Sequence, residues 1–123
     1  MLNIELIEDQ SIAILSPDNK LDKEDFIQAG KLIDPFIQQN GHLNGLVIHT
    51  QKFPGWEDIS ALIAHFRFVH DHHKKIHRVA LVSDSALLQY LKYFTKHFVA
   101  AEIKEFDYSE LQRASDWAAA KET

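Results

Sequence analysis

Residues 79–98 read VALVSDSALLQYLKYFTKHF, and this stretch decides the fold. It opens with four consecutive apolar residues, Val79 to Val82, a run that predicts an interior strand buried on both faces of a mainly parallel sheet. The small polar residues Ser83, Asp84 and Ser85 then end the strand and offer side-chain oxygens that can cap a helix. The sequence therefore predicts a buried strand, a short turn and a helix in direct succession.

The predicted helix, residues 86–98, carries an apolar stripe wider than one sheet face needs. Its members recur every three or four residues and their neighbours widen the stripe: Leu87, Leu88, Tyr90, Leu91, Tyr93, Phe94 and Phe98. Ligands of open α/β sheets bind beyond the carboxyl ends of the strands, so a helix that starts there can roof an apolar pocket. Ordinary core packing or a subunit interface would also cover the stripe.

The chain before this stretch predicts a hairpin followed by a helix and a strand. Apolar and polar residues alternate over residues 2–6, and a second short apolar run follows at 11–16. Asp22 suits the N-cap of a first helix, in which Pro35 should cause a kink or a break, and Gly41 suits the left-handed C-cap. A short β-branched strand at 46–48 comes next.

A second helix is expected from Trp56 to the polar run at residues 70–75. Its core-facing side is predicted to hold Ile59, Leu62, Ile63, Phe66 and Val69. Later in the chain, residues 102–106 form a last strand whose charged side chains suit a sheet edge. A final helix is expected to begin at Ser109, with Gln112 completing a capping box.

These elements predict one α/β domain over residues 1–123, with a mixed, mainly parallel sheet of about five strands, an N-terminal hairpin and four helices. Hydrophobic residues make up 46% and charged residues 25% of the chain, which is ordinary for a soluble globular protein. The absence of cysteine excludes disulfides, thiolate nucleophiles and cysteine-ligated zinc, and it agrees with the cytoplasmic location that we expect. The net charge of −5 argues against nucleic acid as a partner, and no apolar run is long enough to predict stable membrane insertion.

The sequence resembles the SpoIIAA-like family over nearly its whole length. The resemblance is carried by Phe53-Pro54-Gly55-Trp56, by Val79–Asp84, and by Ala101–Phe106 followed by Glu110, Ala114 and Trp117. This family is related to the STAS fold of anti-sigma-factor antagonists and is similar in architecture to the CRAL-TRIO lipid-binding domain. The resemblance implies that fold, together with a lid-covered apolar pocket.

One feature of the regulatory STAS proteins is missing from this sequence. Those proteins carry an Asp-Ser-Ser/Thr-Gly motif, whose serine is phosphorylated, at the start of the helix after the third strand. Here that place reads Gly55-Trp56-Glu57-Asp58, and Ser60 is the nearest hydroxyl. The phosphorylation switch is therefore not expected.

Histidines crowd one segment of the chain: His65, His70, His72, His73 and His77. Imidazole is a common ligand of zinc, copper and nickel, but no recognised ligand spacing such as HExxH is present. The alternative is a solvated helix end, where lysines and partly protonated histidines oppose the negative end of the helix dipole. We expect no physiological metal.

Motifs for catalysis and cofactor binding are also missing. The four glycines allow neither a dinucleotide-binding fingerprint nor a phosphate-binding loop, and no GxSxG is present. Ser83 to Ser85 lie where α/β enzymes place reactive groups, and His49 could serve as a base, but no nucleophile, base and orienting group can be named together. We expect no catalytic residue, no cofactor and no enzymatic activity.

The sequence favours a small binding domain in which residues 86–98 cover an apolar pocket for a lipid-like or aromatic molecule. Trp56 and Tyr90 each combine a large apolar body with a polar tip, although Trp56 would also suit a contact between the helix start and the core. The predicted ligand-binding residues are Trp56, Ile59, Ile63, Leu87, Tyr90, Leu91 and Phe94. The alternative is a STAS-like regulatory module that binds a protein partner through exposed apolar surface, and we expect a homodimer.

Overall fold

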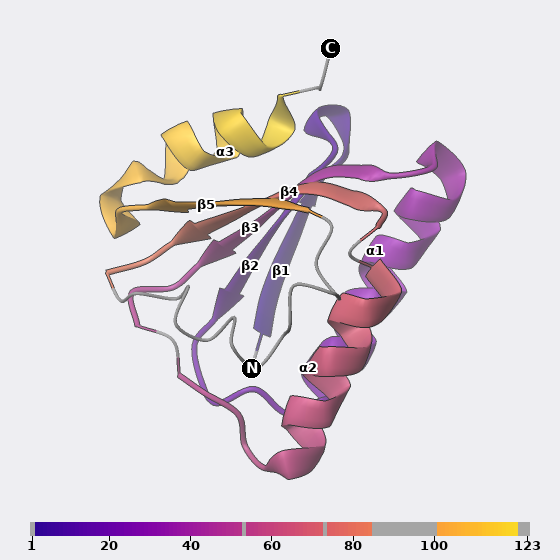
Figure 1. Ribbon diagram of the computed structural model, residues 1–123, viewed down its shortest axis with the longest axis vertical. Coiled ribbons are helices and arrows are strands. Elements are labelled where there is room, and N and C mark those ends of the chain that lie inside the picture. Colours follow the sequence, from indigo (N-terminus) through magenta and orange to yellow (C-terminus); the bar gives the residue numbers. More distant parts are fainter. Residues whose placement is uncertain (1, 53, 73, 85–100, 121–123) are drawn as a thin grey trace.

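The computed structural model describes residues 2–52, 54–72, 74–84 and 101–120, and within α2 it leaves out the side chains of Ile59 and Phe66. A five-stranded sheet in the order β1-β2-β3-β4-β5 forms its centre (Figure 1). The strands are β1 Leu2–Ile7, β2 Ile12–Pro17, β3 Leu43–His49, β4 Ile76–Val82 and β5 Glu102–Phe106. The first two strands form the predicted antiparallel hairpin, and all other neighbouring strands are parallel.

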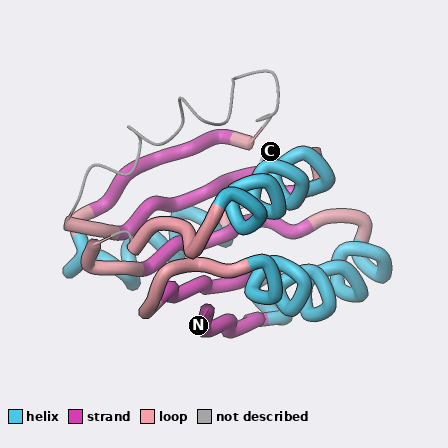
Figure 2. The backbone as a smooth tube through the Cα atoms, turned by 90° about the horizontal axis from the view of Figure 1, so that it is seen from below, coloured by secondary structure: helices cyan, strands magenta, loops and turns pink. Residues whose placement is uncertain are grey.

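Helices cover both faces of this sheet. They are α1 Lys23–Asn40, α2 Ile59–His72 and α3 Leu111–Ala119. The first two lie side by side on one face, whereas α3 lies across the other (Figures 1 and 2). The prediction of an α/β domain with a mixed, mainly parallel sheet is confirmed. The fourth predicted helix, residues 86–98, lies outside the described residues. No helix in the described part of the chain is long and apolar enough to cross a membrane.

Each face of the sheet has its own apolar core, because successive side chains of a strand point to opposite faces. The core on the α1 side consists of Ala13, Leu15, Ala29, Ile33, Phe36, Ile37, Leu43, Leu46 and Ile76. The core on the α3 side consists of Ile12, Val47, Ala80, Val82, Phe106, Ala114 and Ala118. In β4, Ala80 and Val82 are fully buried, but Val79 and Leu81 are only partly buried. Within the predicted run Val79–Val82, burial is therefore complete on the α3 side and only partial on the α1 side.

The ends of α1 follow the predicted signals. The side chain of Asp22 accepts the N–H of Asp25, and the side chain of Asp25 accepts the N–H of Asp22, each at 2.9 Å. Gly41 ends the helix with a φ of 85°, in the left-handed region that favours glycine. Pro35 lies inside this helix, so the predicted break is wrong. A proline removes one helical hydrogen bond, and the apolar face of α1 is anchored in the core on both sides of it.

The close approach of α3 to β3 depends on Gly45. A Cβ atom at this position would lie 2.4 Å from the backbone oxygen of Ala118, closer than two such atoms can pack. The neighbouring Asn44 is buried, and its side-chain amide donates to the carbonyl of Ala119 at 3.1 Å. Glycine at position 45 thus lets the end of α3 lie directly on the sheet.

The predicted start of the last helix is wrong. A 3-10 turn, Tyr108–Glu110, precedes α3, and the capping box is formed by Asp107 and Glu110. The N–H of Asp107 donates to Glu110 Oε1 at 3.0 Å, whereas Gln112 donates to Asp116 further along the helix. Because the chain turns immediately after β5, the first N–H groups that need a cap lie two residues earlier than the sequence pattern suggested.

Candidate functional site

The loop that follows β3, residues 50–58, lies at the carboxyl edge of the parallel strands and is held by the end of β4. Ser83 Oγ and the N–H of Asp84 both donate to the carbonyl of Gln51, each at 3.1 Å. The side-chain amide of Gln51 in turn lies 3.4 Å from Asp84 Oδ2. Ser83 and Asp84 therefore fix this loop, whereas Ser85 lies outside the described residues.

The other side of the loop is bound to the segment before α1. The N–H of Leu21 donates to the carbonyl of Gly55 at 2.9 Å, and the N–H of Glu57 donates to the carbonyl of Leu21 at 2.7 Å. These bonds place Trp56 in a parallel bridge with Leu21. Trp56 is therefore extended backbone, and the prediction that a helix begins there is wrong, since α2 begins at Ile59.

Asp58 supplies the cap of α2 that the sequence analysis did not name. Its Oδ1 accepts the N–H of Ala61 at 3.0 Å and the hydroxyl of Ser60 at 2.8 Å. The backbone bond from Ala61 is the main cause that lowers the pKa of the Asp58 carboxyl, and the Ser60 hydroxyl adds to it. The Ser60 hydroxyl therefore binds the capping carboxylate of Asp58. Ser60 is the nearest hydroxyl to the place of the STAS phosphorylation motif.

Trp56 reaches α2 through a hydrogen bond to His65. Its indole Nε1–H donates to His65 Nδ1 at 2.9 Å, and the imidazole stacks on Phe26 of α1 with ring centroids 4.8 Å apart. Burial lowers the pKa of His65 to about 3, so the ring is neutral at pH 7 and keeps the lone pair that accepts the indole proton. Trp56, His65 and Phe26 form one aromatic group, which we call the Trp56 group, near the amino-terminal ends of α1 and α2.

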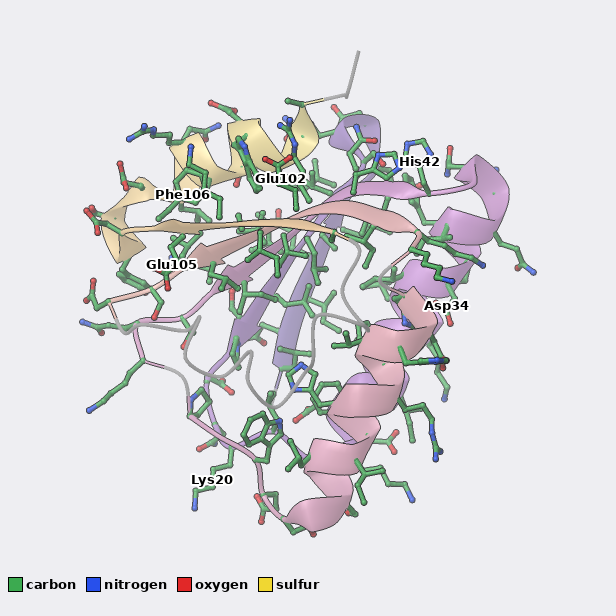
Figure 3. The ribbon with its side chains drawn as sticks, in the orientation of Figure 1. Lys20, Asp34, His42, Glu102, Glu105 and Phe106 are labelled. Atoms are coloured by element: carbon green, nitrogen blue, oxygen red, sulfur yellow. The ribbon has the colours of Figure 1, made fainter. Side chains whose placement is uncertain are left out.

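The side of α2 that faces α1 is formed by Ala61, His65, Phe68 and His72. Ala61 is fully buried, and Phe68 lies 6.1 Å from the ring of Phe26. His72 Nε2 lies 2.5 Å from Asp34 Oδ1 where α1 and α2 meet (Figure 3). Two imidazoles thus take part in the helix contact, because Trp56 and Asp34 supply the polar partners that a buried imidazole needs.

The predicted core-facing side of α2 points elsewhere. Ile63 is 52% exposed, and Leu62 and Val69 are partly exposed. In a helix these positions lie on a different side from residues 61, 65, 68 and 72. The prediction that this apolar side faces the core is therefore wrong for Ile63. We call the exposed Ile63, together with the partly exposed Leu62 and Val69, the Ile63 surface.

The remaining histidines are dispersed. His70 lies 3.4 Å from Asp71, and His77 stacks on His42 with centroids 4.5 Å apart. His49, the conceivable base, stacks on Tyr108 at 4.6 Å. No group of three or more His, Asp or Glu side chains that could hold a metal ion occurs among the residues described in the structure, and His73 is not one of these.

Of the predicted ligand-binding residues, Trp56 and Ile63 are placed by the structure, in the Trp56 group and on the Ile63 surface. Ile59 is the first residue of α2, and its side chain is not described. Leu87, Tyr90, Leu91 and Phe94 lie outside the described residues, so their role stays a prediction. His65 and Phe26 join Trp56 through contacts distant in the chain, which no local pattern signals.

Residues 12–119 match the model of the SpoIIAA-like family. The chain belongs to the SpoIIAA-like family. A crystal structure of an uncharacterized protein from Shewanella loihica PV-4, described as having a SpoIIAA-like fold, is similar with a TM-score of 0.69 and 22% identity, over 96% of this chain and 92% of that chain. That similarity confirms the SpoIIAA-like fold. Among curated proteins, none matches the sequence.

Proposed function

We propose that this SpoIIAA-like chain is a non-enzymatic binding domain for a lipid-like or aromatic small molecule. In this proposal the Ile63 surface is one wall of an apolar site and the Trp56 group closes its end at the carboxyl edge of the sheet. Residues 86–98, with their predicted apolar stripe, supply the opposite wall. The similarity to CRAL-TRIO architecture that the sequence suggests belongs to the same proposal.

The observation that carries the proposal is the orientation of α2. Single exposed apolar residues are common on protein surfaces and need no special explanation. Here, however, the helix places two imidazoles against α1 and leaves Ile63 52% exposed, although Ile63 is the more hydrophobic residue. An apolar ligand would remove that surface from water, and each Å² of buried apolar area contributes roughly 25 cal/mol.

Trp56 is suited to form one end of the proposed site and to report ligand binding through its fluorescence. Its ring is partly exposed, and hydrogen bonds hold its loop on both sides. A rigid aromatic side chain loses little conformational entropy when a ligand packs against it.

A fluorescence titration tests this function. The chain has two tryptophans, so Trp117→Phe leaves Trp56 as the only tryptophan. We expect a long-chain fatty acid to change the Trp56 emission saturably and Ile63→Asp to weaken its binding at least about tenfold, because a charge would enter an apolar contact. Ile27→Asp is the matched control, since Ile27 is an isoleucine on α1 that is 41% exposed, and it should leave binding unchanged. Equal effects of the two substitutions, or no saturable change with fatty acids and aromatic probes, would contradict the proposal.

The second candidate function is a STAS-like regulatory module that binds a protein partner. SpoIIAA-like domains often mediate protein interactions, and the exposed Ile63 is compatible with this use. Native mass spectrometry separates the two candidates. Protein purified without added ligand should retain a small molecule under the first proposal, whereas only chain masses are expected under the second.

A further inference from the structure

The imidazole of His72 lies between two groups that can only accept hydrogen bonds. Its Nδ1 is 2.7 Å from the carbonyl oxygen of Phe68, and its Nε2 is 2.5 Å from Asp34 Oδ1 on α1 (Figure 3). A neutral imidazole has one N–H and one lone pair, so it can donate to only one of these oxygens. The other contact would set a lone pair against an oxygen. An imidazolium ion has an N–H for each contact and satisfies both.

The surroundings place the additional proton on the ring rather than on the carboxyl group. Imidazoles bind protons more tightly than carboxylates do, and the Asp34 side chain is 60% exposed, so burial does not favour its neutral form. His72 lies in the last turn of α2, where the negative end of the helix dipole attracts a cation. Its ring also stacks on Phe68 with centroids 4.1 Å apart, and an aromatic face attracts a cation.

Burial is the main effect that opposes this charge, because the His72 side chain is only 11% exposed. The carboxylate of Asp34 compensates, since hydrogen bonds between charged groups are roughly twice as strong as those between neutral groups. The other described ionisable side chains nearest to the pair in the chain are all exposed: Lys31, Arg67, His70, Asp71, Lys74 and Lys75. Water and salt screen exposed charges, so among the described residues Asp34 decides the charge of His72.

We propose that the fold holds His72 as an imidazolium ion and that this proton fastens the end of α2 to α1. When the proton is lost, one of the two contacts loses its hydrogen, and the last turn of α2 separates more readily from α1. The folded chain binds this proton more readily than the unfolded chain does. Its contribution to stability is therefore full below about pH 6.5, where an unfolded histidine titrates, and is lost as the pH rises. This device is independent of the apolar site proposed on α2.

His65 imposes the opposite requirement on the same side of α2. Its Nδ1 must keep a lone pair to accept the indole proton of Trp56, and burial lowers its pKa to about 3. The contribution of His65 is therefore lost as the pH falls, whereas that of His72 is lost as the pH rises. The contact between α1 and α2 thus needs one neutral and one charged imidazole, and it is strongest over a limited pH range.

Nitrogen NMR of the histidine rings tests the charge directly, because an imidazolium ion and the two neutral tautomers give different shift patterns. At about pH 7.5 the histidines of the urea-unfolded chain are mainly neutral. In the folded chain His72 should still show the imidazolium pattern, and Asp34→Asn, which removes the charge but keeps the size, should make it neutral. Asp71→Asn is the matched control, since it removes an exposed carboxylate that contacts His70 instead, and it should leave His72 charged. A neutral His72 in the native chain, or equal effects of the two variants, would overturn the proposal.

Amide exchange tests whether the proton fastens α2. Residues 68–72 have the same sequence neighbours in the native chain and in Asp34→Asn, so intrinsic exchange rates cancel when the two are compared at one pH. From about pH 6.5 to about pH 9 the native chain should lose at least about tenfold in protection relative to Asp34→Asn, whose amide can bind a neutral ring at both pH values. A ratio of exchange rates that stays constant with pH would show that Asp34 acts through packing alone, and the proposal would be wrong.

Discussion

His65 shows how the contacts of one residue set its charge. In water an imidazole titrates near pH 6.5, but burial in the Trp56 group lowers the pKa of His65 to about 3. The folded chain therefore binds this proton less readily than the unfolded chain does. The contribution of His65 to stability is present above about pH 6.5 and is lost as the pH falls toward 3.

Replacing His65 by glutamine should remove this pH dependence. Glutamine offers a carbonyl that can accept the Trp56 indole proton, but it does not titrate. Between pH 7 and pH 5 the native chain should lose up to about 2 kcal/mol of unfolding free energy through His65, and His65→Gln should lose correspondingly less. Urea unfolding at the two pH values measures the difference. Equal losses in both chains would show that the His65 ring protonates freely in the fold.

At the scale of elements, α1 and α2 differ in how far their packing could be predicted from the sequence. α1 ends at a left-handed glycine and buries an apolar side, which sequence patterns anticipate. α2 packs through Ala61, His65, Phe68 and His72, which they do not anticipate, because the partners Trp56 and Asp34 come from other parts of the chain. The spacing of apolar residues therefore predicted that α2 is a helix, but it did not predict which side of the helix packs against α1.

Replacing a glycine by alanine should have opposite effects on stability in β3 and in α1. Gly45→Ala would place a Cβ 2.4 Å from the Ala118 carbonyl oxygen and should cost about 1–3 kcal/mol, as overpacking does. Gly30→Ala, in the middle of α1, would meet its nearest atom at 3.5 Å and should stabilise the fold by up to about 1 kcal/mol through helix propensity. Chemical denaturation of both variants checks the pair. A Gly45→Ala chain as stable as the native one would show that α3 does not pack on the sheet as described.

At the scale of the whole molecule, most of the sheet could be predicted from the sequence. Residues 102–106 form the last strand of the described sheet with the predicted bounds, because the pattern that predicts them is local. β3 extends to Leu43, before the predicted start, because the N–H of Leu43 bonds to the carbonyl of Lys75 and continues the pairing. The Trp56 group could not be predicted, since it joins residues from a loop, α1 and α2 that only the fold brings together.

The central claim is that the SpoIIAA-like chain binds an apolar molecule at the Ile63 surface. Methyl NMR of isoleucine-labelled protein during titration with a fatty acid tests it most directly, because it reports on each isoleucine separately. The account predicts saturable shifts for the Ile63 methyl group, with Ile27 on α1 and the buried Ile33 unmoved. An Ile63 signal that stays in place at saturating fatty acid, or one that shifts no more than Ile27, would contradict the claim.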